Sequence, residues 1–168
     1  ACSRRAILTQ AGQRVDASHC FQPACMALLK KVVADTGAEL ILSSSWRLFE
    51  HSRDAAAAGL ARHGLALAGW TGVVGGESPG ARVDQILDFA GRAAGVAAWA
   101  AVDDEDLAPA AAQGAESLMR SIFRQRFVRT HAETGLDAAA AVRLVRKLLD
   151  EGDSSDDEPG PEGRDGST

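Results

Sequence analysis

The sequence is poor in aromatic and sulfur-containing side chains and contains no long apolar run. Its 168 residues include no tyrosine, three tryptophans and three cysteines. An odd number of cysteines without a Cys-x-x-Cys spacing argues against a disulfide framework and fits a reducing compartment. No stretch reaches the roughly 20 apolar residues that span a bilayer. We therefore expect a protein of the cytoplasm or of another reducing compartment, with no membrane partner.

The net charge of −5 lies almost entirely at the C-terminal end of the chain. Residues 151–168 carry seven acidic side chains and one arginine, a net charge of −6, which leaves the rest of the chain at about +1. This segment is rich in Gly, Pro and Ser, so it is predicted to be a disordered acidic tail. A near-neutral body gives no electrostatic case for broad nucleic-acid binding.

Helical and strand patterns alternate through the body of the chain. The predicted helices cover residues 23–36, 46–62, 82–94, 109–122 and 138–149, and the predicted strands cover 39–42, 96–102 and 127–130. This order predicts an α/β domain over residues 20–150, a Rossmann-like parallel sheet with helices on both faces. Residues 1–19 form a poorly defined N-terminal segment, and 65–78 read as a Gly-rich loop. In the last helix, Val142 is expected to be buried.

A first cluster of polar side chains follows the apolar stretch at residues 40–42. Ser43, Ser44 and Ser45 come directly after it, and Arg47 follows two positions later. Open α/β sheets bind ligands at the carboxyl ends of their strands, and hydroxyls with a guanidinium suit a phosphate or carboxylate. The phrase predicts an anion site. The alternative is a turn in which the hydroxyls bond to nearby backbone.

A second polar cluster, Asp103-Asp104, follows the apolar stretch at residues 96–102. In a parallel sheet this cluster lies at the same edge as the serines. Mg²⁺ needs only one or two carboxylates and completes its coordination with water and phosphate oxygens, so the two aspartates are candidate magnesium ligands. The alternative is a solvated turn. Arg82 begins the helix that leads to this strand and is a candidate phosphate ligand, with a surface arginine as the alternative.

These phrases, in this order, resemble the haloacid dehalogenase (HAD) superfamily, and most of all the HAD domain of Swiss-army-knife RNA repair-like proteins. The matching phrases are residues 36–47, 69–71, 82–86 and 99–104, and Thr130 with Gly135-Leu136. The resemblance covers about residues 20–150. It implies a Rossmann-like domain that binds Mg²⁺ and a phosphate group.

The resemblance also assigns roles to individual residues. Ser43 would hold the phosphoryl oxygens, with Ser44, Arg47 and Arg82 as further phosphate-binding residues, and the Asp103-Asp104 pair would hold the metal. In active members an aspartate at the end of the first strand attacks phosphorus, and a second aspartate two residues later acts as general acid and base. The ligand would be a phosphorylated small molecule or a nucleic-acid end.

This sequence departs from the family pattern at its start, because no Asp-x-Asp-Gly phrase precedes Ser43. Either the chain begins after the missing phrase, or residues 6–12 are a degenerate version of it, with Thr9 and Ala11 at the aspartate positions. The first, central strand of the sheet is accordingly expected to be lacking or degenerate.

Three functions follow from these alternatives. The first hypothesis is a HAD-type Mg²⁺-dependent phosphohydrolase domain that is truncated and inactive as given, because its nucleophile is missing. The alternative is a non-catalytic phosphate- or protein-binding pseudo-phosphatase module. A weaker third hypothesis is an interaction protein that works through its acidic tail.

Overall fold

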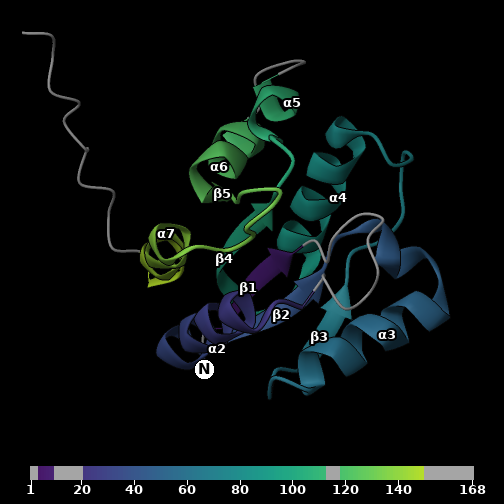
Figure 1. Ribbon diagram of the computed structural model, residues 1–168. Helices are drawn as coiled ribbons and strands as arrows, with labels where there is room; N and C mark the ends of the chain where they lie inside the picture. Colours follow the sequence, from purple (N-terminus) through teal and green to yellow (C-terminus); the bar gives the residue numbers. More distant parts are fainter. Residues whose placement is uncertain (1–3, 10–20, 113–117, 150–168) are drawn as a thin grey trace, which may run out of the picture.

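The computed structural model describes residues 4–9, 21–112 and 118–149. In these residues five strands form one sheet in the order β3-β2-β1-β4-β5, and each neighbouring pair is parallel (Figure 1). The strands are β1 (Arg4–Thr9), β2 (Ala38–Leu42), β3 (Leu67–Trp70), β4 (Val96–Asp103) and β5 (Phe127–Arg129). A parallel sheet flanked by helices confirms the predicted Rossmann-like α/β class. The predicted acidic tail lies outside the described residues.

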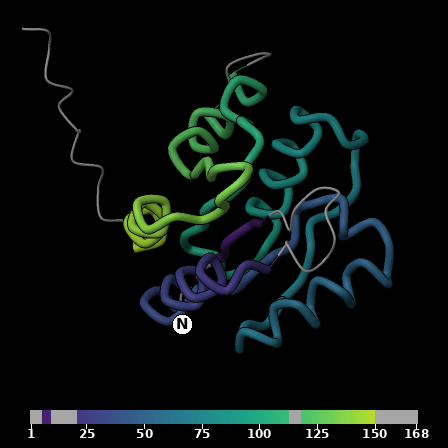
Figure 2. The backbone as a smooth tube through the Cα atoms, viewed as in Figure 1, coloured from purple at the N-terminus to yellow at the C-terminus, as the bar shows by residue number. Residues whose placement is uncertain are grey.

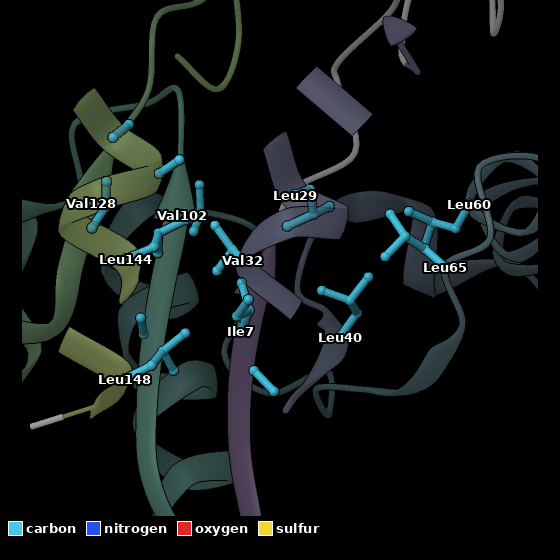
Figure 3. Close-up of a cluster of buried hydrophobic side chains, with 14 of the residues drawn as sticks. Ile7, Leu29, Val32, Leu40, Leu60, Leu65, Val102, Val128, Leu144 and Leu148 are labelled. Carbon is cyan, nitrogen blue, oxygen red and sulfur yellow. The ribbon is translucent and has the colours of Figure 1, made fainter. Parts of the chain in front are cut away.

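The helices cover both faces of the sheet. They are α2 (Pro23–Thr36), η1 (Ser45–Leu48), α3 (Glu50–Ala61), α4 (Pro79–Arg92), α5 (Ala108–Ala112), α6 (Leu118–Arg126) and α7 (Ala138–Leu149). Successive residues of a strand point to opposite faces. Ile7 of β1 therefore packs in a cluster with α2, α3 and α7, which Figure 3 shows. Its neighbour Leu8 packs in a second cluster with α4, α5 and α6.

The first strand is present, and it occupies the centre of the sheet. On one side of β1, Ile7 pairs with Leu40, and on the other side it pairs with Ala100. Figures 1 and 2 show this strand, in purple, between β2 and β4. The alternative of a missing first strand is therefore wrong, and the domain extends into the 1–19 segment. In the phrase at residues 6–12, residues 6–9 belong to β1, and Ala11 lies outside the described residues.

Local sequence signals fix the ends of the helices. α2 begins at Pro23, which suits the first turn, and ends at Gly37, whose positive φ of 67° allows its N–H to bond to the Val33 carbonyl at 2.8 Å. Ser78 caps α4 by accepting a hydrogen bond from the Ala81 N–H at 3.2 Å. Asp137 caps α7, with Oδ1 accepting from the Ala140 N–H at 2.6 Å.

The structure corrects three details of the sequence-based prediction. The predicted loop at 65–78 contains the edge strand β3, whose four residues include Gly69 and the half-exposed Trp70, so no apolar run marks it. The weak helix predicted at 109–122 is two helices, α5 and α6. Val142 is 51% exposed, because α7 turns Leu144 and Leu148 into the core instead.

The close packing of Phe21 on α3 gives a stability prediction. A β-carbon at Gly59 would lie far inside van der Waals contact with the Phe21 ring, which packs edge-on against Trp46. Gly59→Ala should therefore cost about 1–3 kcal/mol of the free energy of unfolding, although alanine favours helix. At Gly91 of α4 the added β-carbon meets nothing within 4 Å. Urea unfolding should show Gly91→Ala to be neutral or stabilising, and equal effects at both sites would contradict this packing.

Candidate functional site

The carboxyl ends of β1, β2 and β4 bring Thr9, Ser43 and Asp103 to one edge of the sheet. The Ser43 N–H and Oγ both donate to the Thr9 carbonyl, at 3.0 and 3.2 Å. On its other side Thr9 pairs with Val102, the residue before Asp103. The predicted meeting of the serine and aspartate clusters is therefore present, with Thr9 between them at the end of the central strand.

Arg82 forms a buried ion pair at the end of β4. Its Nη1 donates to Asp103 Oδ2 at 2.9 Å and to Glu105 Oε2 at 3.1 Å. Asp103 Oδ1 accepts the Glu105 backbone N–H at 2.9 Å. The side chains of Arg82 and Asp103 are only 6% and 2% exposed. Arg82 is thus buried at this edge of the sheet rather than a surface arginine, and each oxygen of Asp103 accepts one hydrogen bond within the protein.

Burial dominates the electrostatics of Asp103. It raises the pKa of this carboxyl to about 6, and the nearby Asp104 charge acts in the same direction. The Arg82 cation and the two hydrogen bonds oppose the shift without cancelling it. Because an ionised carboxylate loses its hydration when it is buried, even a well-placed arginine offsets that loss incompletely. Asp103 is therefore an acid that can change its protonation state near pH 6.

Arg47 is turned inward and holds the backbone that follows β2. Its Nη1 donates to the carbonyls of Ser43 and Ser44, at 2.8 and 2.7 Å, and its Nη2 donates to Gln85 Oε1. The residue is 3% exposed. Burial lowers the pKa of Arg47, and the positive charge of Arg82 lowers it further. Both Nη groups of Arg47 thus bind the protein itself, and they fix the path of the serine phrase.

Gln85 extends this contact to the Gly-rich segment after β3, and sequence reasoning missed it. Its Nε2 donates to the carbonyls of Val74 and Gly76, at 2.6 and 2.9 Å. Arg47 and Gln85 therefore tie the end of β2, helix α4 and the 74–76 segment together. A signal was present in the sequence, because Gln85 is a polar residue on the buried face of an amphipathic helix, three positions after Arg82.

Three buried polar atoms near the carboxyl ends of β2 and β3 have no hydrogen-bond partner within the described part of the chain. They are Ser44 Oγ, Arg47 Nε and Thr71 Oγ1. The Thr71 N–H continues the β2–β3 ladder by donating to Leu42 O at 3.0 Å, which places its side chain just beyond the strands. Buried hydroxyls without partners cost stability and are commonly satisfied by water or by a ligand. Sequence reasoning did not single out Thr71.

A cavity of about 160 Å³ opens beside the ends of β1 and β4. Its lining includes Thr9, Asp103, Asp104, Cys25 and His131. The rest of the wall comes from Gln22 and α2, from Val102 of β4, from residues 130–136 and from Leu144 of α7. The cavity has room for several water molecules.

Thr9, Asp103 and Asp104 thus face this cavity, whereas the predicted phosphate-binding residues do not line it. Buried side chains that are not among the lining residues are those of Ser43, Ser44, Arg47 and Arg82.

Cys25 anchors one wall of the cavity. Its Sγ donates to the Thr134 carbonyl at 3.1 Å, and Gly135, with φ of 68°, approaches it so closely that a β-carbon there would lie 3.0 Å from the sulfur. His131 and Gly135 also pair through an isolated bridge. Cys25 thus has a packed position on α2, and it holds the 131–135 segment against this helix.

The sheet order, the polar strand ends and the arginine at the start of α4 define a HAD-type, phosphohydrolase-like domain. The chain matches the family model for the HAD domain in Swiss Army Knife RNA repair proteins over residues 2–141, well over half its length, and it belongs to that family. The match includes β1. Neither curated proteins nor solved structures gave a match. Among the described helices, none has the length and apolar character that crossing a membrane requires.

HAD domains are generally Mg²⁺-dependent, so the fit of this edge to Mg²⁺ can be examined. Each oxygen of Asp103 accepts one hydrogen bond, from Arg82 or from the Glu105 N–H, and keeps a lone pair that a cation could use. Thr9 supplies a hydroxyl, not a carboxylate, at the end of β1. Within residues 4–9, 21–112 and 118–149 no three His, Cys, Asp or Glu side chains are grouped so that they could hold a metal. Because one or two carboxylates with water and phosphate oxygens can hold Mg²⁺, Asp103 and Asp104 are the described residues that could hold it here.

The Arg47–Gln85 contact gives a prediction about local stability. Gln85→Met leaves an Arg47 Nη2 group and two loop carbonyls without partners, so it should cost about 1–3 kcal/mol of the free energy of unfolding. Hydrogen exchange should become faster in residues 72–78. Gln125→Met on the exposed side of α6 is the matched control and should change stability by less than about 0.5 kcal/mol. Unchanged hydrogen exchange in residues 72–78 would show that Gln85 does not hold this segment.

The raised pKa of Asp103 gives a prediction about pH. The folded protein binds this proton more tightly than the unfolded chain, so ionisation of Asp103 lowers stability as pH rises from 3.8 to about 6. Over this interval the wild type should lose up to about 3 kcal/mol relative to Asp103→Asn. Urea unfolding at a series of pH values measures the difference, with exposed Asp54→Asn as control. A pH-independent difference between wild type and Asp103→Asn would exclude the shift.

Proposed function

We propose that this domain is a HAD module that binds a phosphate group without hydrolysing it. The observation that carries the proposal is Thr9. It ends the central strand, its carbonyl is hydrogen-bonded to Ser43, and it pairs with the residue before Asp103. The resemblance places the attacking aspartate at this position, and a threonine side chain has no carboxylate with which to form an aspartyl-phosphate.

The second aspartate position points the same way. Ala11 stands two residues after Thr9, and a methyl group can neither give nor accept a proton in general acid–base catalysis. A threonine hydroxyl could attack only with a base to activate it, and Asp103, the carboxylate at the end of the neighbouring strand β4, is held in an ion pair with Arg82. The chain thus lacks the groups that split a phosphate ester by the family's route, while the strand that would carry them is present.

The capacity to hold an anion is supported by other residues. Ser44 Oγ and Thr71 Oγ1 are buried hydroxyls that have no hydrogen-bond partner among the described residues, and Arg82 supplies positive charge beside Asp103. Ser43 can bond a phosphoryl oxygen by redirecting the hydroxyl that now donates to Thr9. Because the family is named for RNA repair proteins and the body is nearly neutral, we infer a terminal phosphate on RNA, bound locally, rather than a long stretch of backbone.

The competing function is an active phosphohydrolase, and turnover separates the two. We expect no hydrolysis of p-nitrophenyl phosphate, or of RNA oligonucleotides with a 5′- or 3′-phosphate, with or without MgCl₂. The same oligonucleotides should bind more tightly than their unphosphorylated forms in a fluorescence titration. Ser44→Ala should weaken that preference by about tenfold, which corresponds to one lost hydrogen bond to a charged group, whereas Ser121→Ala on α6 should not.

Two results would overturn this function. Turnover that disappears in Ser43→Ala would make the domain an enzyme. Equal binding of phosphorylated and unphosphorylated oligonucleotides, and no binding of inorganic phosphate, would instead leave the protein-binding alternative.

A further inference from the structure

Two exposed aromatic side chains follow the strand ends that carry the buried hydroxyls. Phe49 is 59% exposed and Trp70 is 50% exposed, whereas all other phenylalanine and tryptophan side chains of the protein are buried or half-buried. Trp70 ends β3 directly before Thr71, and Phe49 lies five positions after Ser44. Large apolar side chains that gather on a surface commonly mark a binding site.

Arg53 of α3 joins the two aromatic residues. Its backbone N–H donates to the Phe49 carbonyl at 3.0 Å, and its guanidinium lies over the Trp70 ring, 4.6 Å from the ring centroid. The Arg47 carbonyl accepts a hydrogen bond from Arg53 Nη1 at 2.8 Å, which holds the guanidinium in this position. A backbone hydrogen bond and a cation–π contact thus order Arg53 and Trp70 before any ligand binds. We call Phe49, Arg53 and Trp70 the aromatic surface.

The pairing of β2 with β3 places the aromatic surface beside the candidate anion site. Leu42 lies opposite Trp70, and the Thr71 N–H continues this ladder by donating to Leu42 O. Ser44 Oγ and Thr71 Oγ1 are the buried hydroxyls that find no partner among the described residues. The segments that end the same two paired strands therefore supply both the hydroxyls and the aromatic surface, so a ligand larger than a phosphate group can contact both.

The charges next to the aromatic surface favour a stacked base over a run of phosphates. Glu50 begins α3, and Asp54 follows Arg53 directly. Their carboxylates repel a phosphate backbone, whereas an uncharged base is not repelled. Aromatic rings and arginine planes are the groups on which proteins stack the bases of single-stranded RNA. This composition suits one or two bases at the end of a strand.

We propose that the aromatic surface stacks on a nucleobase of a single-stranded RNA end whose terminal phosphate lies at the Ser44 and Thr71 hydroxyls. The phosphate and the RNA rest on the proposed function, and the stacking rests on the Arg53–Trp70 contact and the exposure of the two rings. Because every base has a π face, the domain should select the end of the strand rather than its sequence.

Abasic oligonucleotides test the stacking separately from the phosphate. The probes are short single-stranded RNA oligonucleotides with a 5′- or 3′-phosphate, and the same chains in which the phosphorylated terminal nucleotides are abasic. In a fluorescence anisotropy titration, the wild-type protein should bind the complete oligonucleotide about tenfold more tightly than the abasic one, because stacking of a base on an aromatic ring contributes a factor of this order.

Variants of the aromatic surface should change this ratio of affinities. Trp70→Ala and Phe49→Ala should each lower it about fivefold or more, whereas Trp70→Phe keeps a ring and should retain most of it. The matched control is Leu118→Ala, which removes a 78% exposed apolar side chain from α6 and should leave the ratio unchanged. Circular dichroism establishes that each variant is folded.

Equal binding of the complete and abasic oligonucleotides by the wild type would overturn the inference and leave the proposed function standing. A base preference that folded Trp70→Ala and Phe49→Ala leave unchanged would also overturn it. Self-association that Trp70→Ala abolishes, without any base preference, would instead make the aromatic surface a contact between copies of the chain. No preference for phosphorylated ends and no binding of inorganic phosphate would refute the proposed function, while the comparison of complete and abasic chains would still decide the stacking.

Discussion

The pairing of β1 in the middle of the sheet is the constraint on which the rest of the structure depends. This strand bonds to β2 on one side and β4 on the other. Its six residues therefore form one of the two strand pairings that each neighbour makes. Because parallel strands end at the same edge, the registers of both pairs also decide which polar residues meet there. Thr9 lies opposite Leu42 and Val102, and this register sets the serines and the aspartates on either side of it.

A second constraint is the presence of two buried guanidinium groups at that edge. A buried cation is stable only when its donors are satisfied, and the two arginines meet this need differently. Arg82 uses carboxylates, whereas Arg47 uses carbonyls and Gln85. The same contacts that satisfy Arg47 shape the serine phrase and hold the segment after β3. Stability and the geometry of the site are therefore coupled through the same hydrogen bonds.

The parts of this arrangement differ in how well the sequence predicts them. The sequence predicts α2, β4 and α7, because Pro23, Gly37 and Asp137 mark helix ends and because β4 is an unbroken apolar run. The sequence does not predict β3, since this strand is short and pairs on one side only. β1 is ambiguous from its composition, and it becomes a strand because two neighbours need partners.

The residues of the candidate site also differ in how well the sequence predicts them. In a parallel sheet the serine and aspartate clusters lie at the same edge, so the sequence predicts that Ser43 and Asp103 come close together. Which groups bond to which depends on side-chain directions across the fold. The inward turn of Arg47, the role of Gln85 and the sharing of Arg82 between two carboxylates are consequences of burial. Of these features, only Gln85 has a signal in the sequence, as a polar residue on the buried face of an amphipathic helix.

These differences affect how the surviving site residues should be understood. Arg82 and Asp103 satisfy each other, as do Arg47 and Gln85, and removing any of them would leave a buried charge or donor without its partner. The fold alone is therefore sufficient reason for their presence, whether or not chemistry takes place at this edge. Thr9 needs only to fit a central strand, which a β-branched residue does well. A threonine at this position therefore has little structural cost.

A few buried polar groups at this edge are not explained by hydrogen bonds within the protein. Ser44 Oγ, Thr71 Oγ1 and Arg47 Nε are buried polar atoms that find no partner in the described part of the chain. A fold that needed only stability would gain by replacing such hydroxyls with apolar groups of similar size, since a buried donor without an acceptor opposes folding. Their presence at the edge where parallel sheets bind ligands is a stronger reason to infer binding than the ion pair of Arg82 and Asp103, even though the ion pair looks more like an active site.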